Sequence, residues 1–144
     1  MSLKIEPVNR YNWEQCAGLS LDDNQSKFLP TNLYTIAQSK YENLDLYALS
    51  LDNTIIGMAA VGFFAKVHWI SRIMIDKSYQ NLGYGTSFLE LILAKIFADR
   101  AANEIRTAIH PDNIVAQKLF RNKGFELLGK MEDGELIFHK WTYR

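Results

Sequence analysis

The chain has 144 residues, of which 48% are apolar and 22% are charged, a composition typical of one globular domain with a real core. Its formal net charge is zero, so no overall field attracts it to nucleic acid or to an anionic membrane. The one cysteine, Cys16, excludes an internal disulfide and fits a reducing compartment. No apolar run approaches the roughly 20 residues of a membrane span, and the first residues lack the apolar stretch of a signal peptide. We therefore expect a single domain over residues 1–144, located in the cytoplasm, with neither nucleic acid nor membrane as a partner.

Strand and helix patterns alternate along the first half of the chain. Four segments have the alternation or the β-branched content of strands: residues 3–8, 45–51, 54–64 and 67–75. Two segments have helical spacing: residues 12–19 and 31–42. The polar stretch Asp22 to Lys27, followed by Pro30, separates the two helices. Asp52-Asn53 is a hairpin signal between the second and third strands.

The second half begins with a turn that contains Gly83 and Gly85 and leads into a helix expected from Tyr84 to Arg100. The apolar stripe of this helix consists of Phe88, Leu89, Ile92, Leu93 and Ile96. A strand (104–109), a helix (113–123) and a hairpin (125–131 and 135–141, over Asp133-Gly134) follow. A helix that crosses from the strand ending at Ile75 to the strand containing Ile105 implies a parallel pair within a mostly antiparallel sheet. The sequence thus predicts a mixed α/β domain.

The glycine turn has the features of an anion site. A strand, a glycine-bearing turn and a helix start can direct several backbone N–H groups at one point, and the helix N-terminus adds about half an elementary charge. Such a site suits a phosphate or pyrophosphate, because the missing Cβ lets the ligand reach the amides. The turn contains neither a Walker A motif nor GxGxxG. For the glycine pair alone, an ordinary strand-to-helix connection is the alternative.

Two segments in the same order resemble motifs of the GCN5-related N-acetyltransferase (GNAT) superfamily. The stretch "QNLGYG", Gln80 to Gly85, resembles motif A, whose pattern is Arg/Gln-x-x-Gly-x-Gly/Ala. The stretch "NIVAQKLFRNKGF" resembles motif B through Asn113, Ala116, Leu119 and Gly124-Phe125. The stretch "SRIMID" and the N-terminal segment resemble the bacterial spermine/spermidine (diamine) N-acetyltransferase branch. The matching N-terminal residues are Asn12-Trp13, Gln25, Phe28, Asn32 and Ala37.

The resemblance implies a twisted, mostly antiparallel sheet of about six to seven strands, with helices on both faces and a splayed parallel pair. It implies an acyltransferase that moves an acetyl group from acetyl-CoA to a primary amine of a small molecule, by direct attack in a ternary complex. The favoured acceptor is a polyamine such as spermidine or spermine. The alternatives are a protein N-terminal or lysine acetyltransferase and a non-catalytic module that binds CoA. The sequence assigns neither the acceptor nor the oligomeric state, although family members commonly form homodimers.

The resemblance also implies which residues hold acetyl-CoA. The pyrophosphate would bind to Gln80, Asn81, Leu82, Gly83, Tyr84, Gly85 and Thr86. The pantetheine arm would pair with the backbone of Ile73, Met74 and Ile75. Asn113 would bind the arm from the other side, with a helix N-cap as its alternative role, and Phe120 would pack against the arm.

Besides binding the pyrophosphate and the pantetheine arm, the reaction requires proton transfer. A primary amine has a pKa near 10.4, so the neutral form costs roughly 4–5 kcal/mol at pH 7. Relatives often place an acidic base on the fourth strand, where this chain has Ser71 and Arg72. His110 is the candidate catalytic base, because histidine accepts protons near neutral pH. The alternatives are that His110 is merely a polar residue at a strand end and that water deprotonates a desolvated amine.

Two further predictions concern the leaving group and metals. The family's usual acid is a tyrosine in motif B, where this chain has Phe120. We therefore expect the CoA thiolate to leave unaided and to be protonated by water, since a thiol pKa lies near 8.5. Histidines 68, 110 and 139 have no metal-ligand spacing, so no metal is expected.

Overall fold

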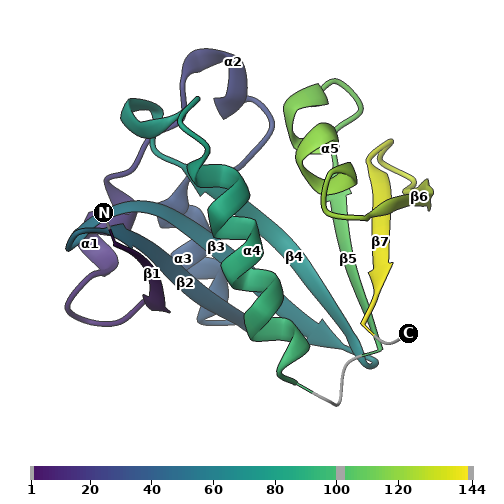
Figure 1. Ribbon diagram of the computed structural model, residues 1–144, viewed down its shortest axis with the longest axis horizontal. Helices are drawn as coiled ribbons and strands as arrows, with labels where there is room; N and C mark the ends of the chain where they lie inside the picture. The colour runs from purple at the N-terminus through teal and green to yellow at the C-terminus, as the bar shows by residue number, and fades with distance from the viewer. Residues whose placement is uncertain (1, 100–102, 143–144) are drawn as a thin grey trace.

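The computed structural model describes residues 2–99 and 103–142 and shows a mixed α/β fold (Figure 1). Within these residues, seven strands form one sheet in the order β1-β2-β3-β4-β5-β7-β6. The strands are β1 (Leu3–Pro7), β2 (Leu44–Leu51), β3 (Thr54–Phe64), β4 (Val67–Ile75), β5 (Glu104–Ile109), β6 (Glu126–Lys130) and β7 (Leu136–Trp141). The helices are α1 (Trp13–Ala17), α2 (Asp23–Ser26), α3 (Asn32–Ser39), α4 (Tyr84–Phe97) and α5 (Ile114–Arg121), with a 3-10 turn η1 (Lys77–Tyr79). None of these helices is long and apolar enough to span a membrane.

The hairpins form where the sequence predicts them. Asp52 and Asn53 have positive φ angles of 48° and 74°, as the favoured two-residue hairpin turn requires. Gly134 has a φ of 93° in the turn between β6 and β7. The prediction is incomplete for the polar stretch at residues 22–27, which contains the short helix α2 (Asp23–Ser26). The Asp22 carboxylate starts this helix by accepting a hydrogen bond from the Gln25 N–H at 3.0 Å.

The parallel pair of strands is splayed, which confirms the prediction. β4 and β5 pair at three positions, Val67 to Trp69 with Glu104 to Arg106. Just beyond, the Thr107 hydroxyl donates a hydrogen bond to the Ile70 carbonyl at 2.9 Å. The two strands then diverge toward their C-terminal ends (Figure 1). A register shift opposite Ala60 and Val61 leaves Ser71 as an extra residue in β4, and such a bulge bends the strand.

Both faces of the sheet are covered by helices, and apolar side chains are buried between the sheet and the helices. The predicted stripe of α4 is buried on one face, in the same cluster as Phe120 of α5. On the other face α1 and α3 cover a smaller cluster that includes Cys16, Met58 and Met74. Figure 1 shows α4 in front of the sheet and α3 behind it. This arrangement confirms the prediction of helices on both faces; the predicted end of the α4 helix at Arg100 lies outside the described residues.

Candidate functional site

The glycine turn presents the start of α4 without a side-chain cap. Gly83 is the N-cap residue and has a φ of 86°, a conformation that glycine adopts without strain. Gly85 lies in the first helical turn with an ordinary φ, and a Cβ added there would meet no protein atom within 4 Å. The packing of the protein therefore does not require glycine at position 85. The start of α4 thus has no side-chain cap, and the space beside Gly85 is open.

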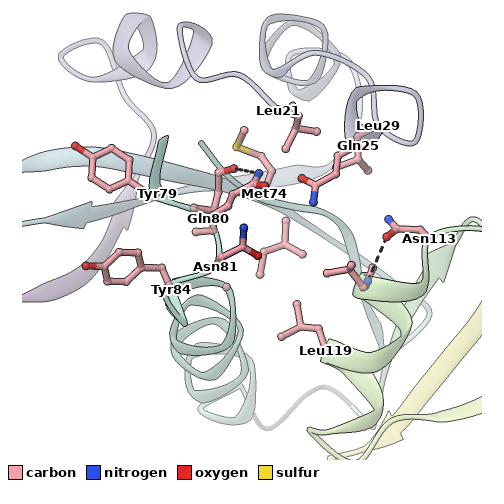
Figure 2. Close-up of a pocket in the computed structure, with 15 residues that line it drawn as sticks. Leu21, Gln25, Leu29, Met74, Tyr79, Gln80, Asn81, Tyr84, Asn113 and Leu119 are labelled. Atoms are coloured by element: carbon pink, nitrogen blue, oxygen red, sulfur yellow. Dashed lines mark hydrogen bonds between the residues drawn. The ribbon is translucent and has the colours of Figure 1, made fainter. Parts of the chain in front are cut away.

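This space belongs to a cavity, which we call the turn cavity, between the glycine turn, η1, the C-terminal part of β4, α2 and α5 (Figure 2). It brings together most of the residues predicted to bind a cofactor: Ile73, Met74, Ile75, Gln80, Asn81, Tyr84, Gly85 and Asn113. The predicted residues Leu82, Gly83 and Thr86 lie beside the cavity but do not line it, and the Leu82 side chain is exposed.

Two of the polar side chains predicted to bind the cofactor make hydrogen bonds to other residues of the protein. The Gln80 amide donates a hydrogen bond to the Ile75 carbonyl at 2.8 Å, which ties the glycine turn to the end of β4 (Figure 2). The Asn113 side-chain oxygen accepts a hydrogen bond from the Ala116 N–H at 3.2 Å. Asn113 thus has the capping role that the sequence left as an alternative, while its side-chain nitrogen remains at the cavity wall.

The turn cavity also contains residues that sequence reasoning did not assign to a site. Leu21, Gln25 and Leu29 form its wall on the side of α2. Gln25 extends from this wall toward the centre of the cavity (Figure 2). The only signal for it was its place among the residues that resemble one branch of the superfamily.

A second cavity, the strand cavity, occupies the gap between the diverging strands β4 and β5. Residues 28–30, the first turns of α5 and Glu135 close its remaining sides. Four residues line both cavities: Leu29, Ile73, Asn113 and Ala116. Phe120, which was predicted to pack against a cofactor, lines the strand cavity and not the turn cavity. Its side chain is 2% exposed and lies edge-on to Phe125 at 5.0 Å between ring centroids.

Charges of opposite sign line the strand cavity. Arg72 is 4% exposed, and its Nε donates a hydrogen bond to the Asn32 side-chain oxygen at 2.9 Å. Its buried Nη1 has no hydrogen-bond partner in the described part of the chain. Burial lowers the pKa of Arg72 to about 10, so the side chain is still a cation at pH 7. Glu135 is half-buried in the same lining.

His110, the predicted base, lines neither the turn cavity nor the strand cavity. Its side chain is 44% exposed, and its ring lies 5.0 Å from the ring of Phe28 between centroids. The Asp112 N–H donates a hydrogen bond to His110 Nδ1 at 3.1 Å. The contacts of His110 are therefore those of a polar residue at a strand end. Within residues 2–99 and 103–142, no group of three or more side chains could hold a metal ion.

Known proteins resemble the chain over nearly its whole length. It is 25% identical over 153 residues to the "Probable spermine N(1)-acetyltransferase" of Bacillus subtilis subsp. natto (strain BEST195), covering 97% of this chain and 99% of that protein. The ribosomal-protein-S18-alanine N-acetyltransferase from Escherichia coli has a similar structure, with a TM-score of 0.78 at 16% identity over 99% of this chain and 96% of that one. The PaiA N-acetyltransferase from Thermoplasma acidophilum, in complex with coenzyme A, gives a TM-score of 0.74 at 18% identity over 98% and 99%.

At sequence identities of 16% and 18%, the likeness to these two structures shows the fold alone. The family itself is shown by the sequence model for the "Acetyltransferase (GNAT) family", which matches residues 11–125. The match includes β4, the glycine turn, β5 and α5, which supply most of the lining of the two cavities, while Glu135 lies beyond it. The chain therefore belongs to the acetyltransferase (GNAT) family, and it is an acyltransferase.

Proposed function

We propose that the protein transfers the acetyl group of acetyl-CoA to a primary amine of a small molecule. The observation that carries this proposal is the position of the two cavities, which share four lining residues where β4 and β5 diverge. The turn cavity takes the donor and the strand cavity takes the acceptor. Their shared wall is then the place where the thioester and the amine meet.

The turn cavity fits acetyl-CoA on the chemistry of its own residues. The open space at Gly85 and the uncapped N–H groups at the start of α4 suit a pyrophosphate. Residues Ile73 to Ile75 of β4 pair with β3 on one side and have no strand pairing on the side where β5 has diverged. On that side the Ile75 carbonyl accepts the Gln80 amide, and the remaining backbone groups of Ile73 to Ile75 can bind the amides of the pantetheine arm.

The four residues of the shared wall include no acid or base, and Glu135 lines only the strand cavity, so the proton is left to solvent. Attack of the neutral amine on the thioester carbonyl forms the C–N bond, breaks the C–S bond and releases CoA thiolate. Phe120 cannot donate a proton, and the Ser71 hydroxyl donates to the Ala60 carbonyl at 3.3 Å and is no base at neutral pH. We therefore propose that water accepts the amine proton and later protonates the thiolate.

Names of relatives point to a polyamine as the acceptor. The curated relative at 25% identity is named for spermine, which supports spermine and spermidine as the first acceptors to try. The E. coli neighbour is named for a protein alanine, but its likeness extends to the fold alone. The choice of a polyamine as the acceptor thus rests on the name of a relative and not on a contact in the strand cavity.

A thiol-release assay tests the proposed activity. Purified protein is mixed with acetyl-CoA and, in turn, with spermine, spermidine, lysine and short peptides, while calorimetry measures acetyl-CoA binding in parallel. We expect binding of acetyl-CoA and amine-dependent release of thiol. Binding without release for any amine would favour the non-catalytic CoA module, and absence of binding would contradict the proposal altogether.

Thr107→Val is expected to weaken both the fold and the donor site. The mutation removes the hydroxyl that binds the Ile70 carbonyl at the point of divergence and leaves that buried group unpaired, at a cost of about 1–3 kcal/mol. We expect a lower melting temperature and a higher KM for acetyl-CoA. Thr107→Ser keeps the hydroxyl and is the matched control. If the two variants behave alike in thermal unfolding and in KM, this hydrogen bond does not set the strand gap.

His110→Ala is expected to leave kcat/KM within about threefold of the wild type, whereas a positioned base contributes about 10²–10⁴. The reason is that His110 lies outside both linings and that its Nδ1 already accepts the Asp112 N–H. The pH profile should then follow the pKa of the acceptor amine. A loss of 10²-fold or more in the mutant, together with loss of a pH limb in the usual histidine range, would identify His110 as the base.

A further inference from the structure

Two charged side chains, Arg72 and Glu135, line the strand cavity, and neither has a charged partner within residues 2–99 and 103–142. Arg72 makes one side-chain hydrogen bond, to the neutral amide oxygen of Asn32, and no carboxylate of the described residues pairs with it. A buried cation without a counter-charge is costly, because it loses hydration and gains no compensating attraction. A negatively charged group of a ligand in this cavity would compensate the guanidinium.

Glu135 provides the opposite charge in the lining of the same cavity. Its backbone is held in the β6–β7 turn, where its N–H donates to the Asp133 carboxylate at 3.0 Å and its carbonyl accepts the Met131 N–H at 2.8 Å. Its own carboxylate makes neither a hydrogen bond nor an ion pair with the part of the chain that the structure describes. Two hydrogen bonds therefore hold the Glu135 backbone in place, while its carboxylate is free to bind a ligand.

We propose that the acceptor is an amine whose molecule also carries a carboxylate, as in a free amino acid. Its carboxylate pairs with Arg72, and its amine pairs with Glu135 as the ammonium ion before it loses a proton to water and attacks the thioester. The apolar rings and side chains of Phe28, Leu29 and Phe120 line the same cavity and suit the aliphatic or aromatic part of such a molecule. A charge-assisted pair between guanidinium and carboxylate is among the stronger interactions that proteins form.

This inference rests on the proposed acetyl transfer and differs from the polyamine that the name of the relative suggests. A polyamine has only positive charges, so it would place ammonium groups in a cavity that already contains an uncompensated guanidinium. The two classes of acceptor can therefore be separated by one chemical group, the carboxylate.

The experiment compares amines that differ only in that group. Wild-type protein is assayed with lysine against cadaverine, ornithine against putrescine, phenylalanine against phenethylamine, and with spermidine as the polyamine. We expect at least one amino acid to exceed its decarboxylated partner in kcat/KM by roughly tenfold or more, the effect of a hydrogen bond to a charged group. We also expect that amino acid to exceed spermidine.

Variants assign the effect to the two side chains. Arg72→Met should remove the preference for the carboxylated acceptor, and Arg72→Lys should restore part of it. Because Arg72 is buried and could be needed for folding, Glu135→Gln provides a second variant at a half-buried position. It should raise the KM for the amino acid roughly tenfold and leave the KM for acetyl-CoA unchanged. Glu132→Gln, at an exposed position in the same turn, is the matched control and should leave both values unchanged.

Three outcomes would overturn the inference. Equal or better turnover of the decarboxylated partners, or faster turnover of spermidine than of every amino acid, would show that the carboxylate is not recognised. Normal acetyl-CoA binding without turnover of any amino acid would overturn it while leaving acetyl transfer to other amines in place. Loss of both acetyl-CoA binding and all turnover would overturn the proposed function, and this inference with it.

Discussion

Gly85→Asp is expected to abolish detectable binding of acetyl-CoA without unfolding the protein. The new side chain has room, because nothing lies within 4 Å of a Cβ at this position and the backbone φ is ordinary. A carboxylate in the first turn of a helix is also favourable for the helix itself. The same carboxylate would stand in the space proposed for the pyrophosphate, where it adds both bulk and repulsion between like charges.

Gly85→Ala separates bulk from charge. Alanine is favoured over glycine within a helix by about 1 kcal/mol, so this variant should melt at a slightly higher temperature while binding acetyl-CoA more weakly. Gly129→Ala is the matched control, because a Cβ at Gly129 also meets no atom within 4 Å and β6 is remote from the turn cavity. Calorimetric titration and thermal unfolding measure the two effects. Wild-type affinity in a folded Gly85→Asp protein would remove the glycine turn from the donor site.

Phe88→Ala is expected to lower the free energy of unfolding by about 3–5 kcal/mol, the usual cost of a large-to-small change at a buried aromatic. Phe88 is fully buried in α4, and its ring lies against β3 at Gly57. A Cβ at Gly57 would come within 3.2 Å of this ring, so the two residues fill one space. Since domains have only about 5–15 kcal/mol in total, the loss is a large fraction of the stability.

Denaturant unfolding measures the effect, with a control on the same helix. Phe97 is at the other end of α4 and its side chain is 43% exposed, so Phe97→Ala should cost well under half as much. The melting temperature of Phe88→Ala should fall on the order of 10 °C or more. Similar losses in the two variants would mean that the buried cluster under α4 does not dominate the stability of the fold.

The elements that sequence reasoning placed best are those with a strong local pattern. β3 and β4 begin and end where their β-branched runs and flanking turns predict, and the α4 stripe is buried as expected. α2 could not be predicted in the same way, because a single helical turn has no apolar period. It depends on one side-chain bond, from Asp22 to the Gln25 N–H. The bulge at Ser71 likewise depends on the register with β3 and leaves no mark in the sequence.

The proposed donor and acceptor sides of the site differ in how far the sequence reveals them. The donor side uses contiguous backbone, so the stretch from Gln80 to Gly85 carries a signal that a linear pattern can detect. The strand cavity combines Arg72 with Glu135, which lie 63 residues apart and belong to no common motif. The surroundings of His110 are also set by tertiary contact, since its ring meets Phe28 from a distant loop. Pairs of this kind become visible only when the chain is folded.

The divergence of β4 and β5 has a consequence for the ligand-free protein. It places an open strand edge in the middle of the sheet, at residues Ile73 to Ile75, where most sheet proteins expose such edges only at the margin. A pantetheine arm that pairs with this edge acts as one more strand and adds its binding free energy to the folded state alone. The supply of acetyl-CoA and the lifetime of the folded chain are then linked. Under the proposed function, depletion of acetyl-CoA would both slow the reaction and leave this edge open to a strand of another chain.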